Sequence, residues 1–190
     1  MTDTDRANKI TTYTGNTIDL DKPDPASFNI IDIAHGLSCE SRFGGHTKDF
    51  YSVAQHSVLV SLLVPPEHAL VALLHDATEA YLKDLQSPIK ARAPEYKALE
   101  KRFHDAICEK FQITEYIDSE IHIADEIMAA AEAVTLLAED VSGWDLVISA
   151  GNYPGEFANA LTLLEANPPL APRQAELLFL NRCKALGGWQ

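Results

Sequence analysis

A histidine, two carboxylates and a hydroxyl interrupt an otherwise apolar stretch in the middle of this chain, at residues 73–81 (LLHDATEAY). The apolar run at residues 69–74 is suited to a hydrophobic core, and it would bring His75 and Asp76 with it. A buried charge is costly unless it is paired, neutralised or bound to a metal. On a helix, Glu79 would lie one turn from both residues. The stretch therefore predicts a helix that carries part of a buried polar site.

Composition restricts the partners of such a site. The chain has 190 residues, is 46% hydrophobic and carries a formal charge of −13, which suits a single domain with an acidic surface. Nucleic-acid polymers and anionic membranes attract positive surfaces, so neither is expected as the main partner. The three cysteines are far apart, with no CxxC spacing, and no apolar run is long enough for a membrane span. We therefore expect a cytoplasmic protein.

The remaining pattern is mostly helical. Helix starts are indicated by Asn29 with Asp32 three residues later, and by Ser52 with Gln55, which resembles a capping box. No alternation of strands and helices is visible, so the predicted class is all-α, with six or seven helices and a small N-terminal β-hairpin at residues 10–20. Residues 1–9 are predicted to be a flexible N-terminus and residues 10–190 a single domain, with its core at 28–140 and C-terminal helices within 155–186. The predicted helices span residues 29–38, 53–64, 66–82, 95–111, 118–140, 155–166 and 172–186, and residues 40–51 and 141–154 are predicted to be loops.

Four polar side chains fall on faces that would otherwise be apolar: His56, His75, Asp76 and Asp125. Two imidazoles and two carboxylates are typical ligands of a divalent transition ion, with cobalt, manganese, zinc, iron and nickel as candidates. Four protein ligands on an octahedral ion would leave positions for water and substrate. An ion with an open position can activate a water molecule for hydrolysis.

A second adjacent pair, His104 and Asp105, shows that an adjacent histidine and aspartate do not by themselves indicate a metal site. It lies on an amphipathic helix beside Glu100, Lys101 and Arg102, so we expect a solvated surface pair. The apolar context of His75 and Asp76 therefore distinguishes them.

Three runs resemble the metal signature of a known superfamily. YSVAQHS, ALLHDATEAYLKDL and IADEI are similar to the signature segments of the HD-domain phosphohydrolases, in the 5′-deoxynucleotidase-like branch, and the resemblance spans roughly residues 28–135. It implies an HD-domain helical bundle in which His56, His75, Asp76 and Asp125 hold one metal ion. It also implies that Glu79 is the catalytic carboxylate that orients or deprotonates the attacking water.

The resemblance also suggests substrate contacts. Arg42 and Phe43 resemble an Arg–aromatic pair in which the arginine contacts the phosphate and the ring lies near the base or sugar, and Asp84 matches an acidic position near the sugar. The chain departs from the family at Gly44-Gly45-His46, which resembles an insertion. His46 and Lys90 are further cations that could oppose the negative background, and Lys90 is the best candidate for a second phosphate contact. Alternatively, Arg42 pairs with Glu40 or Asp49, and His46 is an ordinary loop residue. Trp144 and Tyr153 are expected to pack against other side chains rather than to contact the substrate.

The leading prediction is an enzyme, a metal-dependent phosphohydrolase that cleaves phosphate from deoxynucleoside 5′-monophosphates by attack of a metal-activated water. The first alternative is a deoxynucleoside triphosphate triphosphohydrolase that releases tripolyphosphate, and the second is a non-catalytic nucleotide-binding regulator. A two-metal phosphodiesterase would need a histidine pair that His104 and His122 do not form. The expected partners are a small-molecule nucleotide and further copies of the chain, as a homodimer.

Overall fold

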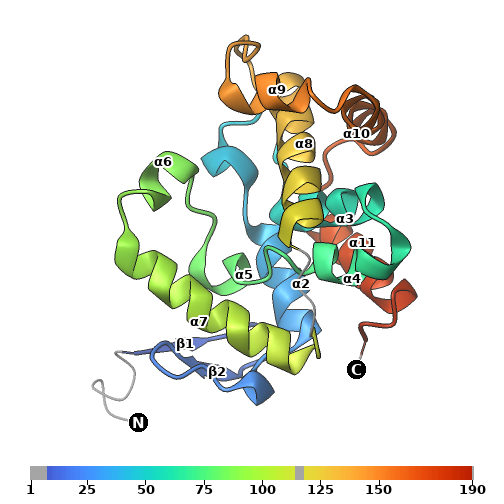
Figure 1. The fold of residues 1–190 in the computed structure, drawn as a ribbon. Coiled ribbons are helices and arrows are strands. Elements are labelled where there is room, and N and C mark those ends of the chain that lie inside the picture. Colours follow the sequence, from blue (N-terminus) through green and yellow to red (C-terminus); the bar gives the residue numbers. More distant parts are fainter. Residues whose placement is uncertain (1–7, 114–117, 190) are drawn as a thin grey trace.

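The computed structural model describes residues 8–113 and 118–189 and is mostly helical, with one small antiparallel hairpin (Figure 1). Ten α-helices and two strands lie within these residues. Their bounds are β1 Lys9–Thr11, β2 Thr17–Asp19, α2 Ile30–Cys39, α3 Val53–Leu63, α4 Ala69–Leu73, α5 Glu79–Leu82, α6 Ser87–Lys90, α7 Pro94–Lys110, α8 Asp118–Leu136, α9 Asp145–Ala150, α10 Pro154–Ala166 and α11 Pro172–Ala185.

The predicted hairpin is confirmed. Strands β1 and β2 pair antiparallel, with Ile10 opposite Ile18, and Gly15 takes the left-handed conformation that the turn requires. Of the N-terminus predicted to be flexible, residues 1–7 lie outside the described residues, and Lys9 already belongs to β1.

Both predicted helix starts are also confirmed. The side chain of Asn29 accepts a hydrogen bond from the backbone N–H of Asp32 at the start of α2, and Ser52 does the same for Gln55 at the start of α3. The Gln55 side chain does not complete a capping box. Instead its amide donates to the carbonyl oxygens of Asn167 and Pro168, which joins α3 to the α10–α11 connection.

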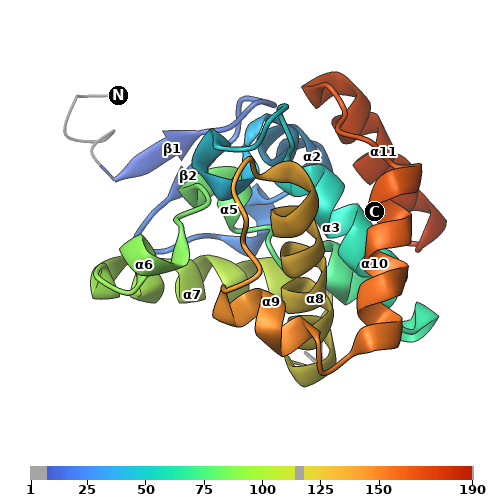
Figure 2. The same cartoon turned by 90° about the horizontal axis from the view of Figure 1, so that it is seen from above.

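Helix α3 is the centre of the fold. It is buried on all sides from Val53 to Ser61 and contacts α2, α4, α8, α10 and α11. Figure 2 shows it between the pair α2 and α11 and the pair α8 and α10. Hydrophobic clusters lie on both sides of it, one around Phe28 and Phe179 and one around Leu59 and Met128. A polar side chain on α3 is therefore removed from water whichever way it points.

The prediction of one helix over residues 66–82 is wrong. Helix α4 ends at Leu73, α5 begins at Glu79, and turns bonded at three-residue spacing lie between them. Nδ1 of His75 lies 2.7 Å from the carbonyl oxygen of Ala72, which in a continuing α-helix would accept from the N–H of Asp76. This side chain–backbone bond competes with the helix, and it cannot be read from helix propensity.

The number of helices was also underestimated. The predicted 66–82 helix is split in two, α6 forms between the predicted helices 66–82 and 95–111, and α9 forms inside the predicted 141–154 loop. Helix α8 ends at Leu136, earlier than the predicted residue 140, and the Arg42–Gly45 segment of the predicted 40–51 loop forms a 3-10 turn. Short helices of one turn are set by tertiary packing more than by local sequence, which is why periodicity misses them.

Among the described residues, no helix combines the length and apolar character needed to cross a membrane.

Candidate metal centre

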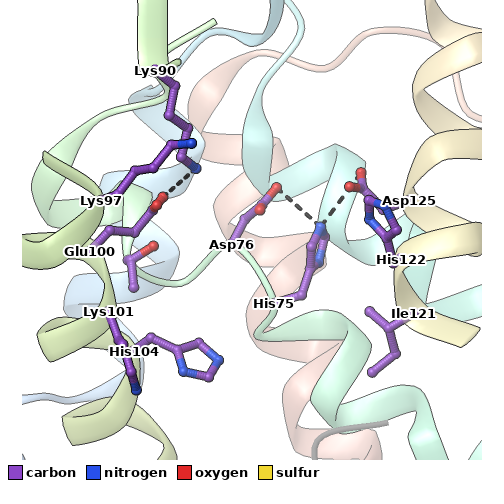
Figure 3. Close-up of a pocket in the computed structure, with 11 residues that line it drawn as sticks. His75, Asp76, Lys90, Lys97, Glu100, Lys101, His104, Ile121, His122 and Asp125 are labelled. Carbon is purple, nitrogen blue, oxygen red and sulfur yellow. Dashed lines mark hydrogen bonds and ion pairs between the residues drawn. The ribbon is translucent and has the colours of Figure 1, made fainter. Parts of the chain in front are cut away.

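Three potential metal ligands meet where α3, α8 and the turn after α4 come together. Ligand atoms of His56, His75 and Asp125 all lie within 4.8 Å of one another. His56 is fully buried in α3, and Asp125 reaches in from α8. Figure 3 shows His75 facing Asp125 on one side and Asp76 on the other. This histidine and aspartate group could hold a metal ion.

Asp76, the fourth predicted ligand, faces the same two imidazoles. Its Oδ2 lies 3.2 Å from Nε2 of His75 and 3.7 Å from Nε2 of His56. Oδ1 of Asp125 lies 3.0 Å from Nε2 of His56 and 3.7 Å from Nε2 of His75. Each Nε2 therefore lies close to two carboxylates, and the structure brings all four predicted ligands together.

The imidazole nitrogens that face the centre of this cluster are oriented to bind a cation. The buried Nε2 atoms of His56 and His75 make no well-directed hydrogen bond to any described residue. The opposite nitrogen of each ring is engaged, with Nδ1 of His75 at the carbonyl oxygen of Ala72 and Nδ1 of His56 2.7 Å from Oε1 of Glu132. When Nδ1 carries the proton, the lone pair of Nε2 is available to a metal.

The charges of the cluster favour ionised carboxylates. Burial disfavours the charged form of His75, but the carboxylates of Asp76 and Asp125 outweigh it and raise the pKa of His75 well above its usual range. Burial works against ionised Asp125 as well, but close contact with His56 and His75 holds the pKa of Asp125 well below its usual range. A metal ion that replaced the proton on Nε2 of His75 would meet the same ionised carboxylates.

Glu79 begins helix α5 and is almost fully buried, with a relative exposure of 7%. Its Oε2 has no hydrogen-bond partner among the described residues. Burial and the nearby carboxylates of Asp76 and Asp84 raise the pKa of Glu79 well above its usual range. A buried carboxylate with a free oxygen and a raised pKa is suited to exchange a proton with a bound molecule.

Glu132, which is fully buried on α8, was not among the site residues predicted from the sequence. Besides facing Nδ1 of His56, Oε1 of Glu132 accepts a hydrogen bond of 2.9 Å from the hydroxyl of buried Tyr51. The only sequence signal was its position seven residues after Asp125, which places both carboxylates on one face of the helix.

Arg42 lies on the far side of Glu132 from His56. Its Nε and Nη2 donate to Oε2 of Glu132, each at 3.3 Å. Both alternative pairings of Arg42 are therefore wrong, since its ion pair is with Glu132. Glu40 pairs instead with Lys83 at 2.7 Å, and Asp49 forms no ion pair with any described residue.

Two cavities surround these residues. The first, here called the metal cavity, has a volume of about 340 Å³ and includes His75, Asp76 and Asp125 in its lining. The second, here called the Arg42 cavity, has a volume of about 570 Å³. Four of the five predicted substrate contacts line the Arg42 cavity, and the fifth, Lys90, lines the metal cavity. The four are Arg42, Phe43, His46 and Asp84.

The wall of the metal cavity opposite the predicted ligands is basic. Lys90 from α6 and Lys97 and Lys101 from α7 line it together with Glu100, and Figure 3 shows the three lysines across the cavity from His75. Lys90 pairs with Glu100, and Lys101 pairs with Asp105. A wall with several ammonium groups beside a cation site suits an anionic ligand.

The Arg42 cavity has aromatic walls. Phe43 and Trp144 both line it, together with apolar side chains of the α8–α9 region. Trp144 precedes α9 and was expected to be a packing anchor, whereas 39% of its surface is exposed. Phe43 and Gly44 have positive φ angles of 54° and 62°, and a side chain at Gly44 would collide with the amide of Gln86. Glycine at position 44 thus lets this turn approach Gln86, which donates to the carbonyl of Phe43.

Of the comparison pair, Asp105 is exposed as expected, whereas His104 is only partly exposed. Side-chain exposure is 57% for Asp105, which pairs with Lys101, against 18% for Asp76. His104 lines the metal cavity, and its side chain is 33% exposed.

Comparison with known proteins places the chain in a family. It is 40% identical over 173 residues to the uncharacterized protein YfdR of Escherichia coli, a match that covers 91% of this chain and 92% of that protein. The chain belongs to the YfdR family. An uncharacterized protein of Rhodobacter capsulatus is 37% identical over 142 residues, which cover 68% of this chain and 71% of that relative. No family model matches this chain.

Proposed function

We propose that this member of the YfdR family is an HD-domain phosphohydrolase that releases phosphate from deoxynucleoside 5′-monophosphates. The observation that carries the proposal is the convergence of His56, His75, Asp76 and Asp125 beside the buried carboxylate Glu79. A cation-binding cluster next to a proton-accepting carboxylate is the minimum that metal-assisted hydrolysis of a phosphate ester requires.

The ligand set, two imidazoles and two carboxylates, suits one divalent ion of manganese, iron, cobalt, nickel or zinc. When bound, such an ion supplies a Lewis acid for a phosphoryl oxygen and lowers the pKa of a water molecule. The remaining steps belong to side chains of the chain itself.

Glu79 is proposed to take the proton from the attacking water. Its raised pKa brings proton acceptance and release closer to neutral pH than for an exposed glutamate. The unpartnered Oε2 leaves an acceptor for that water. The water oxygen bonds to phosphorus, the P–O5′ bond breaks, and O5′ of the leaving nucleoside takes up the proton that Glu79 accepted.

The Arg42 cavity is proposed to hold the nucleoside. Arg42 donates to Glu132 through Nε and Nη2, and the Nη1 amino group is then left to contact the phosphate. Phe43 and Trp144 offer apolar faces to the base, and Asp84 offers an acceptor to a sugar hydroxyl. A volume of about 570 Å³ lies in the range of small-molecule sites.

The test is phosphate release by the chelator-stripped protein from a panel of deoxynucleoside and ribonucleoside 5′-monophosphates, with Co²⁺ or Mn²⁺ added back. We expect release from deoxynucleotides only when metal is present, and loss of at least about 100-fold in kcat in Glu79→Gln. Glu109→Gln, which changes an exposed glutamate on α7, is the matched control and should retain full activity. No release from any monophosphate would refute this substrate class.

The basic wall of the metal cavity favours a second candidate, a deoxynucleoside triphosphate triphosphohydrolase. Lys90, Lys97 and Lys101 could hold phosphates beyond the one at the metal. Cleavage of the same P–O5′ bond would then release tripolyphosphate. Tripolyphosphate as the product, together with a higher KM for triphosphates alone in Lys97→Ala, would decide for this candidate. Nucleotide binding without turnover under any metal would instead indicate a non-catalytic regulator.

A further inference from the structure

Glu132 is a fully buried carboxylate that receives hydrogen bonds from three other parts of the chain. It lies on α8 two turns after Asp125, so both carboxylates face α3. Its contacts are with Tyr51 at 2.9 Å, with His56 at 2.7 Å and with Arg42 at 3.3 Å. Burying a carboxylate is expensive, and fold packing alone does not require one at this position.

The contact with His56 selects which nitrogen of the ring can bind a metal. The imidazole of His56 lies between Asp125 at Nε2 and Glu132 at Nδ1. Both oxygens of Glu132 already accept hydrogen bonds, Oε1 from the hydroxyl of Tyr51 and Oε2 from Arg42, so the carboxylate acts as an acceptor. An acceptor 2.7 Å from Nδ1 of His56 keeps the proton on that nitrogen and leaves Nε2 to the metal cluster.

The contact with Arg42 fixes the position of the guanidinium. The Arg42 backbone is held separately, because its N–H donates to the carbonyl of Tyr51 at 2.9 Å and Ser41 forms a bridge with Ser52. With its backbone tied to the start of α3 and its Nε edge tied to Glu132, Arg42 can present only the rest of the guanidinium to the Arg42 cavity.

From this geometry we infer that Glu132 is a positioning residue that aligns the metal ligand His56 and the phosphate contact Arg42 through one carboxylate. Oε1 serves the metal side and Oε2 serves the substrate side. The metal part of this inference stands on the cluster alone, whereas the Arg42 part rests on the proposed function. Metal affinity and substrate affinity should therefore change together when this one residue is altered.

The test is Glu132→Gln, which keeps the shape of the side chain and removes its charge. We expect its Co²⁺ dissociation constant, measured from the visible absorption of the bound ion, to rise by about 10–100-fold. The KM for the nucleotide should rise by about tenfold with a smaller change in kcat, a split that simple destabilisation of the fold would not produce. Tyr51→Phe, which removes the third hydrogen bond and leaves both other contacts, should change each value by less than about threefold.

Co²⁺ affinity and KM both within twofold of the unaltered protein in Glu132→Gln would overturn the inference. If Glu132→Gln does not fold, Glu132→Asp keeps the charge with a shorter reach, and the same two losses are expected of it. Co²⁺ titration does not require turnover, so an inactive but Co²⁺-binding unaltered protein would refute the proposed function without removing this test.

Discussion

At the scale of single residues, Glu79 is the side chain of the site whose burial is least favourable for folding. It is buried beside two other carboxylates and lacks a partner for one of its oxygens among the described residues. Such a group is retained for a function more readily than for stability, because a neutral isostere would avoid the cost of burying an ionisable carboxyl group.

We therefore predict that Glu79→Gln inactivates the protein yet stabilises its chelator-stripped form at neutral pH, by about 1–3 kcal/mol. The raised pKa means that the folded state holds a proton the unfolded state has lost, so the contribution of Glu79 to stability falls as pH rises above the unfolded pKa of about 4.5 towards the folded pKa. Thermal unfolding in EDTA at a series of pH values measures this. The gain in Glu79→Gln should be small near pH 4.5 and grow with pH. A gain that is largest at low pH would contradict the assignment.

A second residue-scale prediction concerns the Arg42 cavity. Trp144→Ala should raise the KM for nucleotides by about tenfold and leave kcat nearly unchanged, because an aromatic wall binds the base without touching the reacting atoms. Tyr153→Ala is the matched control, since Tyr153 is equally exposed at 39% but does not line the Arg42 cavity. Steady-state kinetics of the two variants would show the difference, and equal KM values would remove Trp144 from the site.

Single residues also show the limits of sequence interpretation. His56 and Asp125 were predicted because they are polar groups on apolar helical faces, and the structure brings them within 3.0 Å. Glu132 has the same kind of position, but a carboxylate two turns along a helix has many possible partners. Only the packing of α3 against α8 identifies them as His56 and Tyr51.

At the scale of secondary structure, the site depends on how closely α5 approaches α2. A side chain added at Gly36 would place its Cβ 2.6 Å from the carbonyl oxygen of Ala80, the residue after Glu79. Glycine at this position is therefore what allows α5 to lie against α2 and to bring Glu79 to the cluster.

Gly36→Ala should accordingly lower both stability, by about 1–3 kcal/mol, and activity, because the backbone of α5 has to move. Gly155→Ala is the control, since a Cβ added at Gly155 would meet no described atom within 4 Å and alanine is the better helix former. Chemical denaturation and kcat report the two effects. A fully active and equally stable Gly36→Ala would show that the contact is unimportant.

Helix starts and helix interiors differ in how well they could be predicted. The starts of α2 and α3 followed from local caps at Asn29 and Ser52, which act within one turn. The break between α4 and α5 did not, since it depends on the orientation of the His75 ring toward Ala72 within the assembled site. Local rules therefore predicted most long helices and failed where the site distorts the backbone.

At the scale of the whole molecule, the fold places a basic wall and a cation site inside a chain of formal charge −13. The sequence identified the cations but not their distribution. Arg42 and Lys90 were expected to serve one substrate, but they line two different cavities, because α6 lines the Arg42 cavity with its start, Ser87 and Pro88, and the metal cavity with its last residue, Lys90. This separation depends on long-range packing, which no local pattern encodes.

Metal binding should stabilise the whole molecule. At a free Co²⁺ concentration of 100 times its dissociation constant, the folded state gains about 2.7 kcal/mol, which corresponds to an increase of several degrees in Tm. Thermal unfolding with and without Co²⁺ measures this increase. It should disappear in His75→Ala and persist in His122→Ala, since the side chain of His122 is 64% exposed and pairs with Glu126.

The most direct test of a catalytic metal centre is the stoichiometry of Co²⁺ binding to the chelator-stripped protein, followed in parallel with phosphate release from deoxynucleoside monophosphates. We expect one bound ion per chain, activity that rises in proportion to occupancy, and neither binding nor activity in Asp125→Asn. An unaltered protein that binds no Co²⁺, or an Asp125→Asn variant that binds and hydrolyses as the unaltered protein does, would contradict the assignment of this centre.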